Sequence, residues 1–156
     1  MHIFKGEISS GIGKHTELYV PGYNQLVKAP ENWPEKLHPG SLNVRISSTG
    51  YPSIFSEREG APSIFTLDEG IIPCAFEIPY DSFGNNALRP TAQMPKRGTA
   101  QVWRSTLAIV EQEIDCWVLR RYGSMVGEVL EVVSHVHLRT AYELQDGQRV
   151  QLRFVH

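Results

Sequence analysis

Short stretches of alternating hydrophobic and polar residues recur along this chain, and turns rich in glycine and proline separate them. The clearest stretch is 41–46, which follows a Pro-Gly turn. Its apolar positions are Leu42, Val44 and Ile46, and its polar positions are Ser41, Asn43 and Arg45. Because successive side chains of a strand point to opposite faces, the stretch predicts a strand with one buried apolar face. The other face would present a hydroxyl, an amide and a guanidinium group together.

The same patterning predicts further strands along the chain. They are expected at 3–9, 17–20, 71–78, 101–103, 107–110, 114–119 and 127–133, and where Val150, Leu152 and Phe154 alternate near the end. Brief helical segments are expected at 23–29 and 137–144, and loops at 47–52 and 87–98. The rest of 47–72, which Pro62 interrupts, shows no clear pattern. Many short strands with little helix and frequent glycine and proline breaks predict an all-β to β-rich fold. Either a closed barrel or a sandwich satisfies this pattern.

The composition and charge of the chain limit which classes of protein it can belong to. With 156 residues, 41% of them hydrophobic, the chain is expected to form a single domain, 1–156, whose core needs no disulfide or metal. A net charge of −2 argues against a nucleic-acid polymer as partner. Cys74 and Cys116 form no C-x-x-C pair, which favours free thiols and a reducing compartment. No apolar run has the length of a signal peptide or a membrane span, so we expect a cytoplasmic protein without membrane contact.

A glycine-rich stretch, Gly11-Ile12-Gly13-Lys14, is the first candidate for chemistry. It does not satisfy the P-loop pattern, which would require glycine at position 8 and serine or threonine at position 15. The chain has Ile8 and His15 there. Main-chain N–H groups of a glycine turn can still bind an anion without a P-loop fold. A phosphate site and a plain hairpin turn therefore remain the two interpretations.

Oxygen-bearing side chains supply the other candidates. Ser41 and Asn43 offer the hard oxygen ligands that Mg²⁺ accepts together with water and phosphate. In the strand expected at 127–133, Glu128 and Glu131 face opposite ways, so one of them is directed toward solvent and the other toward a possible cavity. There it could accept a hydrogen bond from a ligand hydroxyl, although a structural role is the alternative. His135 and His137 permit a metal pair but have no third ligand nearby in sequence.

The order of several motifs resembles a known family. The run 6–13, then Tyr19, Pro21 and Tyr23, then Pro39-Gly40-Ser41-Leu42-Asn43-Val44, resembles the N-terminal half of the archaeal CTP-dependent riboflavin kinases. The runs 128–133, Leu138-Arg139 and Leu144-Gln145-Asp146-Gly147, followed by Val150, resemble the same family's C-terminal part. The resemblance covers about 3–46 and 117–156. The region of about 47–116 is an atypical central insertion, longer than in that family and unlike it.

The resemblance implies a small closed six-stranded barrel of the cradle-loop type, with one or two short helices. It implies transfer of the γ-phosphoryl group of CTP to the 5′-hydroxyl of riboflavin, which gives FMN and CDP. Carried over by position, the nucleotide phosphates would lie on Gly11, Ile12, Gly13, Lys14, His15 and Thr16. Four further nucleotide contacts would come from His137, Leu138, Arg139 and Thr140. Ser41 and Asn43 would bind Mg²⁺, and Asn43 and Glu131 would be the catalytic residues.

The acceptor side of the implied site is less complete. Glu131 would contact the ribityl chain, and Ser124 is the nearest hydroxyl where the family has a flavin-binding threonine. Trp103, Trp117 or Tyr122 would either stack on the flavin ring or pack in the core. Riboflavin and the nucleotide are then the only partners implied, with no partner protein. Two alternatives remain: an enzyme of the same fold that acts on another small molecule, and a non-catalytic barrel that binds a ligand or a partner.

Overall fold

The computed structural model describes residues 1–10, 42–82 and 88–155. The strands of these parts are β1 (His2–Ser9), β2 (Leu42–Ile46), β3 (Phe76–Ile78), β4 (Ala100–Ile109), β5 (Gln112–Arg121), β6 (Val129–Val133) and β7 (Arg149–Phe154). The short helices are η2 (Ser53–Glu57), η3 (Ile64–Glu69), η4 (Tyr80–Ser82) and α1 (Leu138–Ala141), of which the first three are 3₁₀ helices. None of the helices in the described parts is long and apolar enough to cross a membrane.

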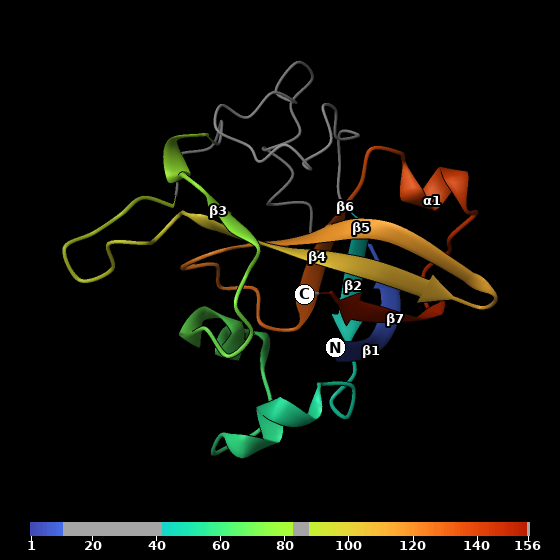
Figure 1. Cartoon of the computed structure of the whole chain (residues 1–156), viewed down its shortest axis with the longest axis horizontal. Coiled ribbons are helices and arrows are strands. Elements are labelled where there is room, and N and C mark those ends of the chain that lie inside the picture. The colour runs from blue at the N-terminus through green and yellow to red at the C-terminus, as the bar shows by residue number, and fades with distance from the viewer. Residues whose placement is uncertain (11–41, 83–87, 156) are drawn as a thin grey trace.

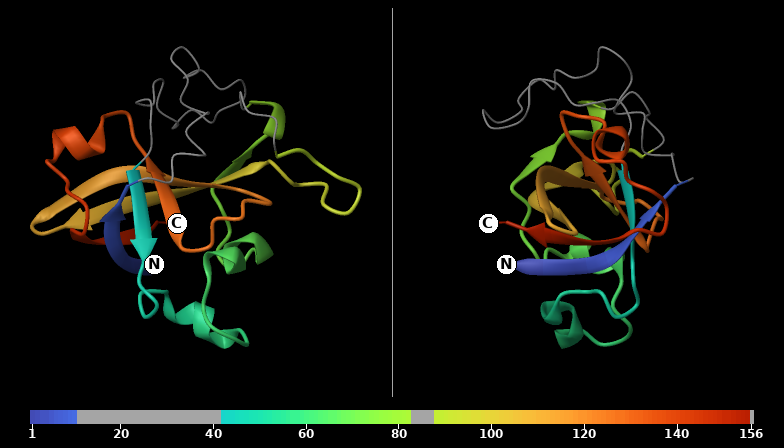
Figure 2. Two further views of the ribbon diagram at one scale, coloured as in Figure 1. Left: turned by 180° about the vertical axis from the view of Figure 1, so that it is seen from behind. Right: turned by 90° about the vertical axis from the view of Figure 1, so that its right-hand side faces the viewer.

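Six of these strands close into an antiparallel barrel (Figures 1 and 2). The order is β4-β5-β6-β2-β1-β7, and β7 pairs again with β4 through Ser105–Ala108 to complete the circle. β3 is an additional strand at the edge of β4, where Phe76 lies opposite Val102. The predicted closed six-stranded barrel with few short helices is therefore confirmed. The strand expected at 17–20 and the helix expected at 23–29 fall outside the described residues.

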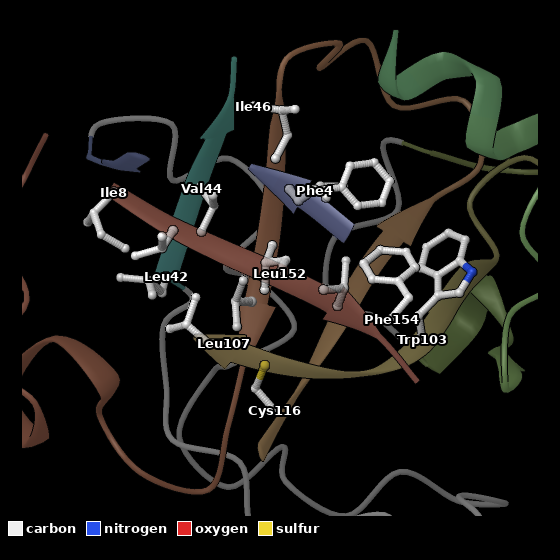
Figure 3. Packing of buried hydrophobic residues seen from close by; sticks show 14 of the residues in the cluster. Phe4, Ile8, Leu42, Val44, Ile46, Trp103, Leu107, Cys116, Leu152 and Phe154 are labelled. Carbon is white, nitrogen blue, oxygen red and sulfur yellow. The ribbon is translucent and has the colours of Figure 1, made fainter. Parts of the chain in front are cut away.

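Alternate residues of each strand fill the barrel interior (Figure 3). The ring centroids of Phe4 and Phe154 are 4.8 Å apart, and Trp103 stacks on Phe154 at 5.5 Å. The indole N–H of Trp103 donates to the carbonyl of Ile72 at 2.9 Å, so this tryptophan is a fully bonded part of the core. Cys116 is also buried there, and burial raises the pKa of its thiol to about 12. It is a free thiol that stays protonated and unreactive at neutral pH.

Two strand predictions differ most from the structure, each for a physical reason. The strands expected at 101–103 and 107–110 are one continuous strand, β4. The polar residues between them break the alternating pattern, so the sequence did not show that the strand is continuous. Ser105 occupies an inward position where an apolar residue is expected. The strand expected at 71–78 is reduced to β3, since Pro73 cannot donate a main-chain hydrogen bond. Ile72 packs in the core instead.

The central segment 47–116 contributes both to the barrel and to its surroundings. It contains β3, β4 and the first half of β5, which are integral to the sheet. The part of 47–72 that shows no clear sequence pattern contains η2 and η3, which lie at the end of the barrel opposite α1 (Figures 1 and 2). Phe55 of η2 packs edge-on against Phe4, and Ile64 and Leu67 of η3 are buried in the same core.

A buried ion pair fastens η3 to the barrel. The Arg120 guanidinium, 4% exposed, donates two hydrogen bonds of 3.0 Å to the Asp68 carboxylate. The amide of Gln101 donates to the same carboxylate at 2.8 Å. Arg120 also donates to the carbonyls of Ser124 and Val126, in the turn that joins β5 to β6. One cation therefore holds three separate segments together at this end of the barrel.

Breaking this pair should lower stability strongly. In an Asp68→Ala variant, Arg120 keeps its buried charge and loses its counter-ion, and we expect a loss of about 3 kcal/mol of unfolding free energy. The matched control is Glu69→Ala, whose exposed carboxylate lies 3.9 Å from Arg58. That change should alter stability by less than about 0.5 kcal/mol. Urea titration followed by far-UV circular dichroism measures both, and equal losses in the two variants would contradict the structural role of Asp68.

Candidate functional site

Three polar residues lie side by side on the outer face of neighbouring strands. Asn43 of β2 is directly opposite Ser9 of β1 on one side and Glu131 of β6 on the other. All three point away from the core, since their strand neighbours Ile8, Val44 and Leu130 fill the interior. Directly opposite residues have Cβ atoms about 5 Å apart. The antiparallel register thus joins a hydroxyl, an amide and a carboxylate into one row.

Asn43 and Glu131 are buried although they lie on the outer face. Their exposed fractions are 7% and 8%. The side-chain oxygen of Asn43 has no hydrogen-bond partner among the described residues. A buried acceptor without a partner is rare in proteins, because losing its bond to water costs about 1–3 kcal/mol. The amide oxygen is therefore well suited to bind a cation or a ligand donor.

The helix α1 lies near the Ser9 end of this row, and a recess beside α1 is lined from the core-facing side of β2 and β6, by Leu42 and Val132, not by the row itself. A recess of about 40 Å³ lies between the start of β2, the end of β6 and α1, and it is lined by Leu42, Val132, Ser134, Val136, His137, Leu138 and Arg139. His137 and Thr140 are exposed, and His137 Nδ1 lies 2.5 Å from the Thr140 hydroxyl. The Leu138 side chain is packed in the core, so only its main chain can reach a ligand. The sequence-predicted residues 137–140 and Asn43 are thus brought to the same end of β2.

The carboxylate of Asp146 ties α1 to the end of β1. It accepts hydrogen bonds from the Ser10 hydroxyl at 2.5 Å and from the Arg139 guanidinium at 2.8 Å. Arg139 also donates to the carbonyl of Ser9 at 3.3 Å. The hydrogen bonds from Ser10 and then Arg139 lower the pKa of Asp146, so its carboxylate is ionised at neutral pH. Arg139 is thereby held beside Ser10, the last described residue before 11–41.

The other sequence-predicted residues are placed as follows. Ser124 lies in the turn between β5 and β6, where it is buried and its hydroxyl accepts a hydrogen bond from the main chain of Val126. It belongs to the opposite end of β6 from the recess at α1. The six nucleotide-binding candidates Gly11, Ile12, Gly13, Lys14, His15 and Thr16 lie outside the described residues, as does the metal-binding candidate Ser41. Their roles remain predictions.

The sequence left open which of Glu128 and Glu131 is directed toward solvent, and the structure decides this. Glu128 precedes β6 and forms an exposed ion pair with Arg45 at 2.7 Å, whereas Glu131 is buried beside Asn43. Within the described residues, no group of three or more histidine, cysteine, aspartate or glutamate side chains gathers to hold a metal. His135 and His137 are both exposed there.

Sequence reasoning missed Ser9 and the bridging role of Asp146. Ser9 is the last residue of β1, and nothing in the local pattern shows that Asn43 will be its partner. Asp146 begins an Asp-Gly pair, which signals a turn and says nothing of a distant arginine. The register of β1 with β2 reveals Ser9, and the hydrogen bonds from Ser10 and Arg139 reveal Asp146.

No model of a known protein family matches the chain, and a search of curated proteins finds no match either.

The residues present are compatible with a divalent cation at the start of β2. Asn43 provides the unpartnered buried oxygen, and the Glu131 carboxylate lies opposite it. Mg²⁺ binds few protein oxygens directly and completes its shell with water and phosphate, so a single amide and a neighbouring hydroxyl or carboxylate satisfy it. Hard oxygen ligands of this kind do not favour zinc, which prefers histidine and cysteine side chains.

Replacing Asn43 should not harm folding. In Asn43→Val, the unpartnered oxygen is removed and a good strand former takes its place, so we expect unfolding free energy to stay equal or rise by about 1 kcal/mol. The control is Val44→Asn on the adjacent inward position, which should cost about 2 kcal/mol or more by burying an amide in the core. Thermal denaturation compares the two. A loss of more than about 1 kcal/mol in Asn43→Val would instead indicate a structural hydrogen bond of this amide.

Proposed function

We propose that this protein is a phosphotransferase of the CTP-dependent riboflavin kinase type, which moves the γ-phosphoryl group of CTP to the 5′-hydroxyl of riboflavin. One observation carries the proposal: Asn43 and Glu131, which the motif resemblance assigns to metal and acceptor, are buried cross-strand neighbours. The two come from motifs almost ninety positions apart in the chain. Their juxtaposition, in a small barrel, is what a single phosphoryl-transfer site requires.

Phosphoryl transfer depends on positioning and on neutralising charge more than on covalent chemistry. The residues Ser41 and Asn43 would hold Mg²⁺, which when bound neutralises phosphate oxygens during transfer. Arg139 would place a second positive charge at the same end of β2, with its orientation fixed by Asp146 and by the carbonyl of Ser9. The glycine-rich stretch 11–16 follows Ser10 in the sequence, and its main-chain N–H groups would bind the phosphates.

Glu131 would act on the acceptor. Its carboxylate can accept the hydrogen bond of the ribityl 5′-hydroxyl, which orients that oxygen toward the γ-phosphorus, and can take the proton as the new P–O bond forms. Burial beside Asn43 keeps competing water away from the reacting oxygen, which limits hydrolysis of the nucleotide. This role is specific to a carboxylate, because an amide of the same shape can orient the hydroxyl but cannot take its proton.

Nucleotide binding tests the proposal directly. In calorimetric titrations with CTP, ATP and GTP, we expect CTP to bind most tightly and its binding to strengthen with Mg²⁺. The Asn43→Val variant should keep CTP binding while losing the dependence on Mg²⁺, since it removes a metal ligand and no phosphate contact. Chromatographic detection of FMN from riboflavin and CTP then identifies the reaction. Absence of binding by every nucleotide would rule out the kinase, whereas CTP binding without FMN formation would point to another small alcohol as acceptor.

The Glu131→Gln variant separates orientation from proton transfer. We expect kcat for FMN formation to fall by about a hundredfold with little change in the KM for riboflavin, because the amide still accepts the hydroxyl hydrogen bond. The control Glu113→Gln changes an exposed carboxylate of β5 that pairs with Arg153. It should leave both constants near their wild-type values. An unaltered kcat in Glu131→Gln would remove this residue from the reaction.

A further inference from the structure

A second, larger hollow lies on the outer face of β1 and β7, which run side by side in the barrel wall (Figure 2). It is a groove of about 630 Å³, bordered by the turn 47–50 and by the tip of the β4–β5 hairpin. Grooves of several hundred cubic ångströms that combine apolar walls with a few polar groups are typical of small-molecule sites. None of the described residues assigned above to nucleotide, metal or acceptor lines this groove.

Positive charge dominates the floor of the groove. Lys5 of β1 and both Arg149 and Arg153 of β7 line it, and Glu7 is the one carboxylate among the described lining residues. Glu7 is directly opposite Arg149 in the register without forming an ion pair with it. Lys5 and Arg149 are exposed, and neither forms an ion pair with any residue in 1–10, 42–82 or 88–155. Because unpaired cations gathered in a concave surface attract negative charge, the groove favours an anionic ligand.

The Arg153 guanidinium in this floor has a donor without an acceptor. Its terminal nitrogens donate to the Glu113 carboxylate at 2.5 Å and to the side-chain oxygen of Gln151 at 3.3 Å. Its Nε–H is buried and has no hydrogen-bond partner among the described residues. A buried donor of a charged group is costly to leave unsatisfied, so it calls for an acceptor from a ligand or a water molecule. The bond to Gln151 occupies that residue's oxygen and leaves its NH₂ group as a further donor in the groove.

The turn 47–50 holds two hydroxyl groups at the side of the groove. The main-chain N–H of Lys5 donates to the Gly50 carbonyl at 2.7 Å, and that of Ser47 donates to the Lys5 carbonyl at 3.0 Å. The turn packs so closely on β1 that a Cβ at Gly50 would lie 2.0 Å from the Lys5 carbonyl oxygen, so glycine is required there. Ser47 and Thr49 line the groove from this fixed turn. Hydroxyl, amide, ammonium and guanidinium donors together suit the several oxygens of a phosphate group.

The wall formed by the β4–β5 hairpin is apolar. Ala108, Ile109 and Val110 line the groove there, and Val110 is 83% exposed. An apolar side chain this exposed favours a ligand that covers it, because covering it removes apolar surface from water. The groove therefore combines an anion-binding floor with an apolar wall.

We propose that this groove binds a small phosphate monoester, with its phosphate over Lys5, Arg149 and Gln151 and its apolar group against Val110. The phosphate oxygens supply acceptors to the two unpaired cations and to the unsatisfied guanidinium of Arg153. This site stands on its own lining residues and does not depend on the proposed kinase function. An anion without an apolar group would leave the hairpin wall uncovered and bind less tightly.

Phenyl phosphate tests the site, because it joins a phosphate to a small apolar ring. We titrate it and inorganic phosphate into the full chain by calorimetry at low ionic strength, without nucleotide or Mg²⁺. Phenyl phosphate should bind saturably and about fivefold more tightly than inorganic phosphate, and Val110→Ser should remove this preference. Lys5→Gln and Arg149→Gln should each weaken phenyl phosphate binding by roughly tenfold, through loss of a charge-assisted hydrogen bond. Both side chains are exposed, so these changes leave the fold intact.

The charge-matched control is Arg104→Gln, which changes an exposed arginine of β4 outside the groove lining. Arg139→Gln shows whether the anion binds beside α1 instead. Both variants should bind phenyl phosphate as the wild type does. No saturable binding in the wild type, equal weakening in Arg104→Gln and Arg149→Gln, or loss of binding in Arg139→Gln but not in Lys5→Gln would each overturn the proposal. Phenyl phosphate binding that depends on Lys5 and Arg149, in a protein that makes no FMN, would support this site and refute only the proposed function.

Discussion

The insertion of β2 between β1 and β6 is the constraint on which the site depends. β2 is only five residues long, yet it pairs with a partner on each side and carries three inward residues of the core. A shift of its register by one residue would turn Leu42, Val44 and Ile46 outward. The burial of these residues therefore fixes Asn43 between Ser9 and Glu131. The core therefore fixes the geometry of this row, although no residue of the row belongs to the core.

Closure of the barrel adds a second effect, because it gives the molecule two ends with different chemistry. At one end, Arg139, Asp146 and Ser10 form a charged, hydrogen-bonded cluster beside α1. At the other, η2 and η3 cover the barrel, and the Arg120–Asp68 pair joins them to it. The outer faces of β2 and β6 connect the two ends. The Asn43–Glu131 pair lies on these outer faces, between the two ends.

The Arg120 guanidinium illustrates how one buried charge can serve both stability and shape. Its hydrogen bonds hold the β5–β6 turn, and its guanidinium lies 5.3 Å from the ring centroid of Phe65 in η3. Satisfying a buried cation requires several acceptors in defined places, and here those acceptors lie in η3 and in the β5–β6 turn.

Much of the barrel follows from the sequence itself. Period-two alternation at 42–46 and 127–133 predicted both strands and placed Asn43 on the face opposite Leu42, Val44 and Ile46, since side-chain direction in a strand is a local property. Which strands become neighbours is a long-range property, so the choice between Glu128 and Glu131, the pairing of Asn43 with Glu131 and the Asp146 bridge to Arg139 came only from the tertiary structure. Ser105 inside the barrel and the 3₁₀ helices of 53–69 escaped prediction because tertiary burial overrode local pattern there. The sequence by itself determined how side chains alternate along each strand, and closure of the barrel decided which face is buried and which residues meet.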